Sequence, residues 1–280
     1  MEGIAVNTQN ILDACTIINF LHIDEDEFLI KKLKAKKFNL CRKVFEETNK
    51  NVFNKFKGSF YNQNLEVKSK IKEVKIKLNY FRERIYYPED YFQLKEEVAA
   101  LTNYSKENGE FISVLLSFYL SKYEKLSIIF HTDDIPAKQH FLPFFESENI
   151  GSINDSIDLL LLLFKSNTDF TSNDLKKYFS SLYSEYTFAI GGLLKEINEF
   201  QIPSNLIRNK QFRITRDAIW QSLKTLDILS LINQYYLVVE HKSEFRPLYD
   251  ILSKYEYFFK QKISNEYLTK IKYHFDYVEE

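Results

Sequence analysis

Short apolar runs alternate with longer amphipathic segments over the first 165 residues, and this alternation limits the possible folds more than any other feature. The runs are ILD, KFNLC, KLSIIF and NIGSIN, and KLSIIF is the clearest of them because it is β-branched, aromatic and short. The segments between them have the spacing and length of helices. We therefore expect an α/β fold in residues 1–165 with a central, mainly parallel sheet and helices on both of its faces.

The alternation ends near Lys165, where the polar stretch KSNTDFTSND resembles a linker followed by a helix cap. Beyond it the apolar residues follow helical periodicity. Gly and Pro are scarce, with 6 and 5 in 280 residues, which favours long helices over many short strands. We expect two parts, an α/β domain in residues 1–165 and a mostly α-helical C-terminal domain or extension in residues 166–280.

The overall composition limits location and partners but does not select a function. A net charge of −1 provides no general attraction to nucleic acid, so any such binding must come from local patches. The two cysteines, Cys15 and Cys41, suggest free thiols in a reducing compartment. The longest apolar run, LLLLLF, is far too short to cross a membrane, and the N-terminus lacks the features of a signal peptide. We expect a cytoplasmic protein with no membrane partner.

Acidic residues follow two of the expected strands and begin or occupy two of the helices. Asp13 and the pair Asp133 and Asp134 come directly after strands, whose carboxyl ends meet at one edge of a parallel sheet. Glu110 begins a helix, and Glu47 lies in the helix after the second strand. Converging carboxylates repel one another, and a divalent cation relieves that repulsion. Metal-assisted phosphodiester hydrolysis is the natural chemistry of such a cluster.

Each of these acids also has an ordinary structural interpretation. An Asp before a helix is often an N-cap, which suits Asp133 or Asp134. Glu110 in a first helical turn is stabilised by the helix dipole alone, and Glu47 could be a solvated surface residue.

The order of four motifs resembles the PIN domain family. ILDACTIINFL resembles the first motif, CRKVFEET the second, NGEFISVLL a variant third and FHTDDIPAKQHF the fourth, so the resemblance covers roughly residues 5–165. Two features depart from the family pattern. The stretch between the second and third motifs is long, and Cys15 stands where another small residue is common.

The resemblance implies a PIN-like three-layer fold and a set of metal-binding acids. Asp13, Glu47, Glu110 and Asp133 would be the catalytic and metal-binding acids, and Asp134 a helix cap or an auxiliary metal ligand. The first prediction is that Asp13, Glu110 and Asp133 share one pocket with Glu47 beside them.

The function implied by the resemblance is a metal-dependent endoribonuclease that uses Mg²⁺ or Mn²⁺. Its substrate would be RNA, such as a single-stranded loop of tRNA, and its role that of a toxin or a defence effector. An inhibitory or activating protein partner, or a homo-oligomer, would use the C-terminal region. Two alternatives stay open: a catalytically inactive PIN-like scaffold that binds a partner protein through its C-terminal helices, and a structure-specific DNA nuclease.

A few further residues are weaker candidates. The lysines of the run Lys31–Lys37 and of the face Lys68–Lys77 could contact a phosphate backbone, although such faces are usually only solvated. Asp155 and Asp158 could add to the acidic cluster but are more typical of helix caps, and His131 at a strand end could reach a phosphate.

Overall fold

The computed structural model describes residues 7–53, 65–87, 89–256, 259, 269–271 and 273–274, and gives the backbone alone for residues 65–68 and 184–189. The chain divides into two compact units. Unit 1 comprises Met1–Lys57 and Tyr61–Tyr178, and unit 2 comprises Gly58–Phe60 and Phe179–Glu280.

A four-stranded parallel sheet forms the centre of unit 1. Its strands are β1 (Thr8–Leu12), β2 (Phe38–Asn39), β3 (Ser127–His131) and β4 (Gly151–Asn154), in the order β2-β1-β3-β4. All three strand pairs are parallel, and Leu12 at the end of β1 lies opposite His131 at the end of β3. This confirms the expected α/β class with a parallel sheet.

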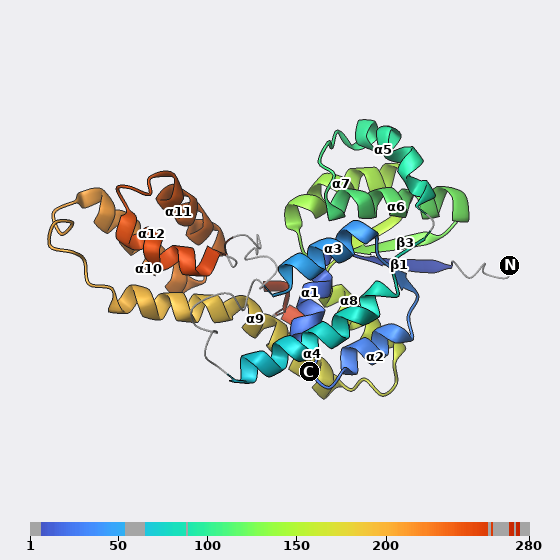
Figure 1. Cartoon of the computed structure of the whole chain (residues 1–280), viewed down its shortest axis with the longest axis horizontal. Helices are drawn as coiled ribbons and strands as arrows, with labels where there is room; N and C mark the ends of the chain where they lie inside the picture. The colour runs from blue at the N-terminus through green and yellow to red at the C-terminus, as the bar shows by residue number, and fades with distance from the viewer. Residues whose placement is uncertain are drawn as a thin grey trace. The chain divides into compact units, whose positions relative to one another are not determined.

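Helices connect every pair of successive strands, as a parallel sheet requires. They are α1 (Ala14–Ile23), α2 (Phe28–Lys34), α3 (Arg42–Asn51), α4 (Leu65–Arg82), η2 (Asp90–Leu94), α5 (Lys95–Thr102), α6 (Gly109–Glu124), α7 (Ile135–Ser147) and α8 (Ser156–Ser166). In Figure 1, α6 and α7 lie on one face of the sheet and α1 and α8 on the other. The chain thus leaves β1 and the adjacent β3 towards opposite faces. The carboxyl ends of β1 and β3 therefore form the topological switch point, where ligands bind in open α/β sheets.

The sheet is held by apolar side chains packed between the helix layers. Ile11, Leu12, Ile128 and Phe130 of the two central strands are almost completely buried. Gly151 begins β4 with a φ of +149°, and a Cβ there would lie 1.9 Å from the carbonyl oxygen of Ile128. Only glycine allows β4 to approach β3 this closely.

The described part of unit 2 is helical. The long helix α9 (Ser172–Glu199) contains the division between the units, and α10 (Lys210–Thr225), α11 (Ile228–Glu240), α12 (Arg246–Leu252) and η3 (Ser253–Tyr255) follow. Across the described residues of both units, no helix combines the length and apolar character needed to span a membrane.

Candidate active site

Asp13 lies at the switch point, directly between β1 and α1. Its backbone N–H donates to the carbonyl oxygen of His131 at 2.9 Å, which continues the ladder between β1 and β3. The residue occupies the N-cap position of α1, but its side chain makes no capping hydrogen bond. Instead, Oδ2 accepts from Thr132 Oγ1 and Cys15 Sγ, each at 3.0 Å. Local helix chemistry therefore does not explain this carboxylate.

The other carboxylate oxygen, Oδ1 of Asp13, is buried and has no hydrogen-bond donor in the described part of the chain. The residue is only 3% exposed. Burial raises the pKa of Asp13 to about 6. The Cys15 thiol, the Ala14 amide and the Thr132 hydroxyl oppose this rise, while the charge of Glu47 adds to it. A buried acceptor without a donor costs free energy and calls for an explanation, such as an ion.

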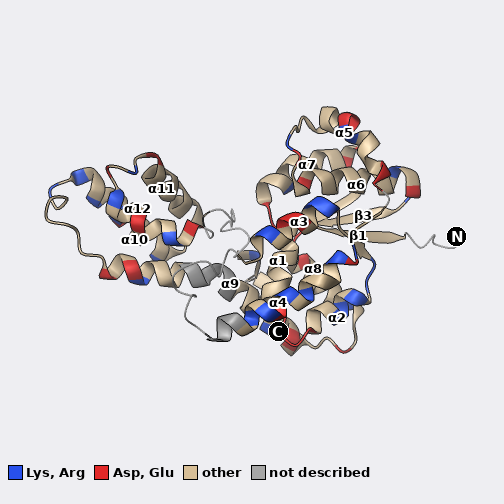
Figure 2. Ribbon diagram, in the orientation of Figure 1, with Lys and Arg blue, Asp and Glu red and all other residues tan. Residues whose placement is uncertain are grey.

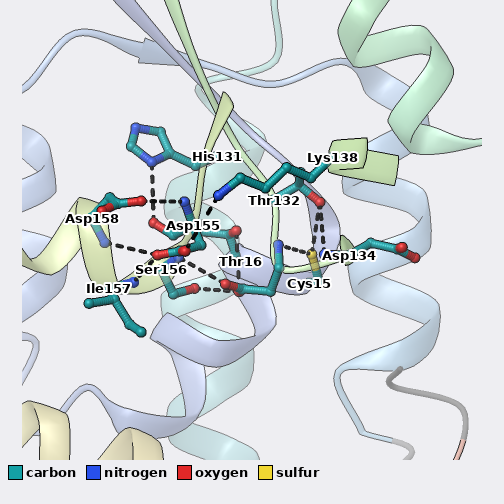
Figure 3. Close-up of polar contacts among 11 residues, drawn as sticks. Cys15, Thr16, His131, Thr132, Asp134, Lys138, Asp155, Ser156, Ile157 and Asp158 are labelled. Atoms are coloured by element: carbon teal, nitrogen blue, oxygen red, sulfur yellow. Dashed lines mark hydrogen bonds and ion pairs between the residues drawn. The ribbon is translucent and has the colours of Figure 1, made fainter. Parts of the chain in front are cut away.

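Cys15 links Asp13 to the loop after β3. Its Sγ donates to Asp13 Oδ2 and accepts from the backbone N–H of Asp133 at 3.1 Å. Burial raises the pKa of this thiol, and the charges of Asp13 and Asp133 raise it further, so the group stays protonated. Figure 3 shows Cys15 directly beside Thr132. Cys15 and Cys41 are both free, as expected from the sequence.

Asp133 is held on both carboxylate oxygens. Oδ1 accepts from the backbone N–H of Ser156 at 2.8 Å, and Oδ2 accepts from Asn19 Nδ2 at 2.7 Å and from Thr16 Oγ1 at 3.4 Å. The Ser156 hydroxyl also donates to Oδ2. Asp133 thereby ties the first turn of α8 to α1. Its oxygens already have donors, unlike Oδ1 of Asp13.

The neighbouring acids are helix caps. Asp134 is the N-cap of α7, where Oδ1 accepts from the Ala137 N–H at 3.1 Å, and its side chain points away from Thr16 and Ser156 in Figure 3. Asp155 caps α8 and forms a capping box with Asp158. The capping interpretation is confirmed for all three.

His131 is fully buried and cannot reach a phosphate on the surface, so that suggestion is wrong. Its Nε2 lies 3.1 Å from Asn10 Oδ1, and Nδ1 lies 3.5 Å from the carbonyl oxygen of Asp155. Asn10 Nδ2 donates to the Lys37 carbonyl, so its oxygen faces the ring and we assign the proton to Nε2. Burial lowers the pKa of His131 to about 4, so the ring is neutral.

Glu47 contacts the first residue of α6, Gly109, and Glu110 is the second residue of that helix. The Gly109 N–H donates to Glu47 Oε1 at 3.0 Å, and a Cβ at Gly109 would lie 2.4 Å from Glu47 Oε2. Glycine at this position therefore lets the Glu47 carboxylate sit against the helix N-terminus. Burial raises the pKa of Glu47, and the Gly109 hydrogen bond partly opposes the rise. Glu110 is the next residue, and its Oε2 accepts from Asn108 Nδ2 at 2.8 Å.

Cys15 thus links Asp13 to Asp133, and the charge of Glu47 acts on Asp13, while the shared pocket of Asp13, Glu110 and Asp133 stays a prediction. Within the part of the chain that the structure describes, no three Asp, Glu, His or Cys side chains are arranged to hold a metal ion. Asp13 and Glu47 are the pair that best fits a cation, because one has a buried oxygen without a donor and each is an acid raised in pKa by burial. No sequence pattern indicated Thr132, Ser156 and Asn19 as the donors that arrange these carboxylates.

Comparisons with models of known protein families, with curated proteins and with solved structures found no match to this chain.

Proposed function

We propose that this chain is a PIN-like, metal-dependent endoribonuclease that uses Mg²⁺ or Mn²⁺. The observation that carries the proposal is Asp13 Oδ1, a buried carboxylate oxygen without a donor at the switch point of a parallel sheet. Such an oxygen is the ligand that hard divalent cations prefer. The order of the four PIN-like motifs supports the same function. Cleavage of cellular RNA by such a nuclease suits a toxin or defence effector in the reducing cytoplasm, restrained by a protein partner.

Asp13 and Glu47 would hold the cation. Glu110 would be a further acid of the site, because it follows Gly109, which donates to Glu47. When bound, the cation supplies Lewis-acid activation of water and neutralises charge on the phosphate. The chain's own contribution is to hold the carboxylates in place. Thr132 and Cys15 fix Oδ2 of Asp13 and leave Oδ1 for the cation. Asp133 would act as a ligand only after giving up some of its present donors.

Thermal melts with Mn²⁺ and with EDTA test the cation site separately from catalysis. A cation that binds only the folded state stabilises it by about 2.7 kcal/mol at a hundredfold excess over its dissociation constant. We expect this gain for the wild type and its loss in Asp13→Asn. Asp134→Asn is the matched control, because Asn also caps a helix. Equal responses to Mn²⁺ in all three proteins would refute the site.

Cleavage is tested on labelled single-stranded RNA and on DNA of the same sequence, with the same three proteins. We expect RNA cleavage that needs Mn²⁺ or Mg²⁺, is lost in Asp13→Asn and is kept in Asp134→Asn. Cleavage of branched or flapped DNA in place of RNA would indicate the structure-specific DNA nuclease. Sequencing of cellular RNA ends after induction of the wild type and of Asp13→Asn would identify the natural substrate.

A non-catalytic scaffold is the second candidate, and two observations favour it. Both oxygens of Asp133 are occupied by donors, and α11 presents an apolar stripe in which Leu229, Tyr236 and Val239 are 65%, 53% and 37% exposed. A stripe of this kind suits a helical protein partner. Unchanged RNA together with no response to Mn²⁺ would favour this candidate.

A further inference from the structure

Among the exposed cationic side chains of α3 and α4 are four that we call the cationic strip: Lys43, Lys50, Lys75 and Arg82. Figure 2 shows Lys and Arg on both helices.

Lys43 and Lys50 flank Glu47 on α3. They precede and follow it by four and three residues, which places all three on one side of the helix. The positive charges of both lysines lower the pKa of Glu47, against the larger effect of burial. The strip therefore ends beside a carboxylate of the candidate active site.

Lys75 and Arg82 join α4 to α3 through aromatic rings. Lys75 Nζ lies 5.6 Å from the centroid of the Phe53 ring, and the Arg82 guanidinium lies 5.5 Å from that of Phe45. Both rings are partly exposed. A cation thus lies against each of these two partly exposed rings.

Among the residues that the structure describes, no member of the strip forms a salt bridge, although Lys43 and Lys50 lie close enough to Glu47 to lower its pKa. Nearby cations differ in this respect, since Arg42 pairs with Glu89 at 3.0 Å. Lys77 pairs with Asp24 at 3.1 Å and is buried. Phosphate contact, suggested for the face Lys68–Lys77, is therefore wrong for Lys77, and the Lys68 side chain lies outside the described residues. Glu46 on α3 and Glu83 just after α4 are exposed acids beside the strip, and Glu73 on α4 pairs with Lys77, so the four cations of the strip still outnumber the unpaired exposed acids.

We propose that the cationic strip binds the phosphate backbone of single-stranded nucleic acid and leads the strand to Glu47 and Asp13. Exposed cations without salt bridges attract a polyanion, and release of the counterions of the nucleic acid supplies the affinity. Partly exposed Phe45 and Phe53 offer surface on which unpaired bases stack, which favours a single strand over a duplex or a lipid surface. Only the direction towards the acids rests on the proposed nuclease function.

The test measures binding by fluorescence anisotropy in the Asp13→Asn background, so that no probe is cleaved. The probes are a labelled single-stranded RNA, the corresponding DNA, and vesicles containing phosphatidylserine. One variant neutralises the α4 pair (Lys75→Gln with Arg82→Gln), and another neutralises the α3 pair (Lys43→Gln with Lys50→Gln).

The matched control removes the same charge at a distance from the strip. It combines Lys125→Gln, at the end of α6 opposite Gly109, with Lys165→Gln, in the last turn of α8 opposite Ser156. Both lysines are exposed, so the control keeps net charge and solubility equal to those of the two test variants.

Each test pair should weaken binding of the single strand by about 25-fold at about 0.1 M salt, because two lost phosphate contacts lower the logarithmic salt slope by about 1.4. The control should bind as the parent does. If only the α4-pair and α3-pair variants bind more weakly, the result supports binding of the single strand by the cationic strip, even if the wild type cleaves nothing. Equal affinity in all variants overturns it even if the wild type is a nuclease, and so does binding to the vesicles without binding to either single strand.

Discussion

Replacing Asp13 with Asn should stabilise the protein, and the gain should depend on pH. Burial raises the pKa of Asp13 from 3.8 to about 6 in the folded state. The ionised carboxylate therefore lowers the free energy of unfolding. This loss is absent well below pH 3.8 and complete well above pH 6. That difference in pKa corresponds to about 3 kcal/mol. Asn carries no charge but needs an acceptor for its amide, so we expect a net gain of about 1–3 kcal/mol at pH 8 and almost none at pH 4.

His131 makes the opposite contribution over nearly the same pH range. Its pKa falls from 6.5 to about 4 on folding because the ring is buried. The unfolded chain takes up this proton first as the pH drops, so stability is lost between 6.5 and 4, again by about 3 kcal/mol. In the wild type the effects of Asp13 and His131 largely cancel. Asp13→Asn removes one of them, so its stability should fall clearly between pH 6.5 and 4 where that of the wild type changes less.

Urea unfolding at pH 4, 6 and 8 measures this directly, with circular dichroism as the signal. The chain's one tryptophan, Trp220, lies in unit 2, so its fluorescence reports on that unit and serves as an internal control. Asp13→Asn should shift the dichroism transition and leave the tryptophan transition in place. An equal gain at pH 4 and pH 8, or no gain at pH 8, would refute the argument that a buried charge at Asp13 is responsible.

Substitutions at three further positions, Gly109, Asp134 and Lys77, test the position of the Glu47 carboxylate, a helix cap and a buried salt bridge. Gly109→Ala places a Cβ 2.4 Å from Glu47 Oε2, so the carboxylate must move; we expect near-normal folding in dichroism melts but a weakened stabilisation by Mn²⁺. Asp134→Ala should cost about 1 kcal/mol in urea unfolding while Asp134→Asn costs little, and neither should change the response to Mn²⁺. Lys77→Met should cost about 3–5 kcal/mol in urea unfolding because it leaves Asp24 buried without its cation, and adding Asp24→Asn should recover much of the loss.

The α/β class could be predicted because it depends on local pattern. KLSIIF became β3 and the weak NIGSIN run became β4, since short β-branched runs between helices have few alternatives to a buried parallel strand. The apolar runs also placed Asp13 and Asp133 correctly at strand ends. What the pattern could not give was the strand order, which depends on long-range pairing and which makes β1 and β3 neighbours.

The site was less predictable because residue type does not show which oxygen lacks a donor. Asp13 and Asp133 have the same sequence context, an acid after an apolar strand. One keeps a buried oxygen without a donor, and the other receives donors from Thr16, Asn19 and Ser156. These donors come from two helices far apart in the sequence. Their convergence is a property of the packing of α1 against α8 and leaves no local signature.

Cys15 contacts both acids, but through different groups. A thiol donates to Asp13 Oδ2 while accepting the Asp133 N–H, so the carboxylate of one acid is coupled to the backbone of the other. Serine could make the same two bonds but is shorter, which would draw the loop after β3 towards β1. The larger sulfur therefore sets the spacing between the two acidic positions. A movement of the Asp133 backbone away from Asp13 must therefore break the contact with Cys15.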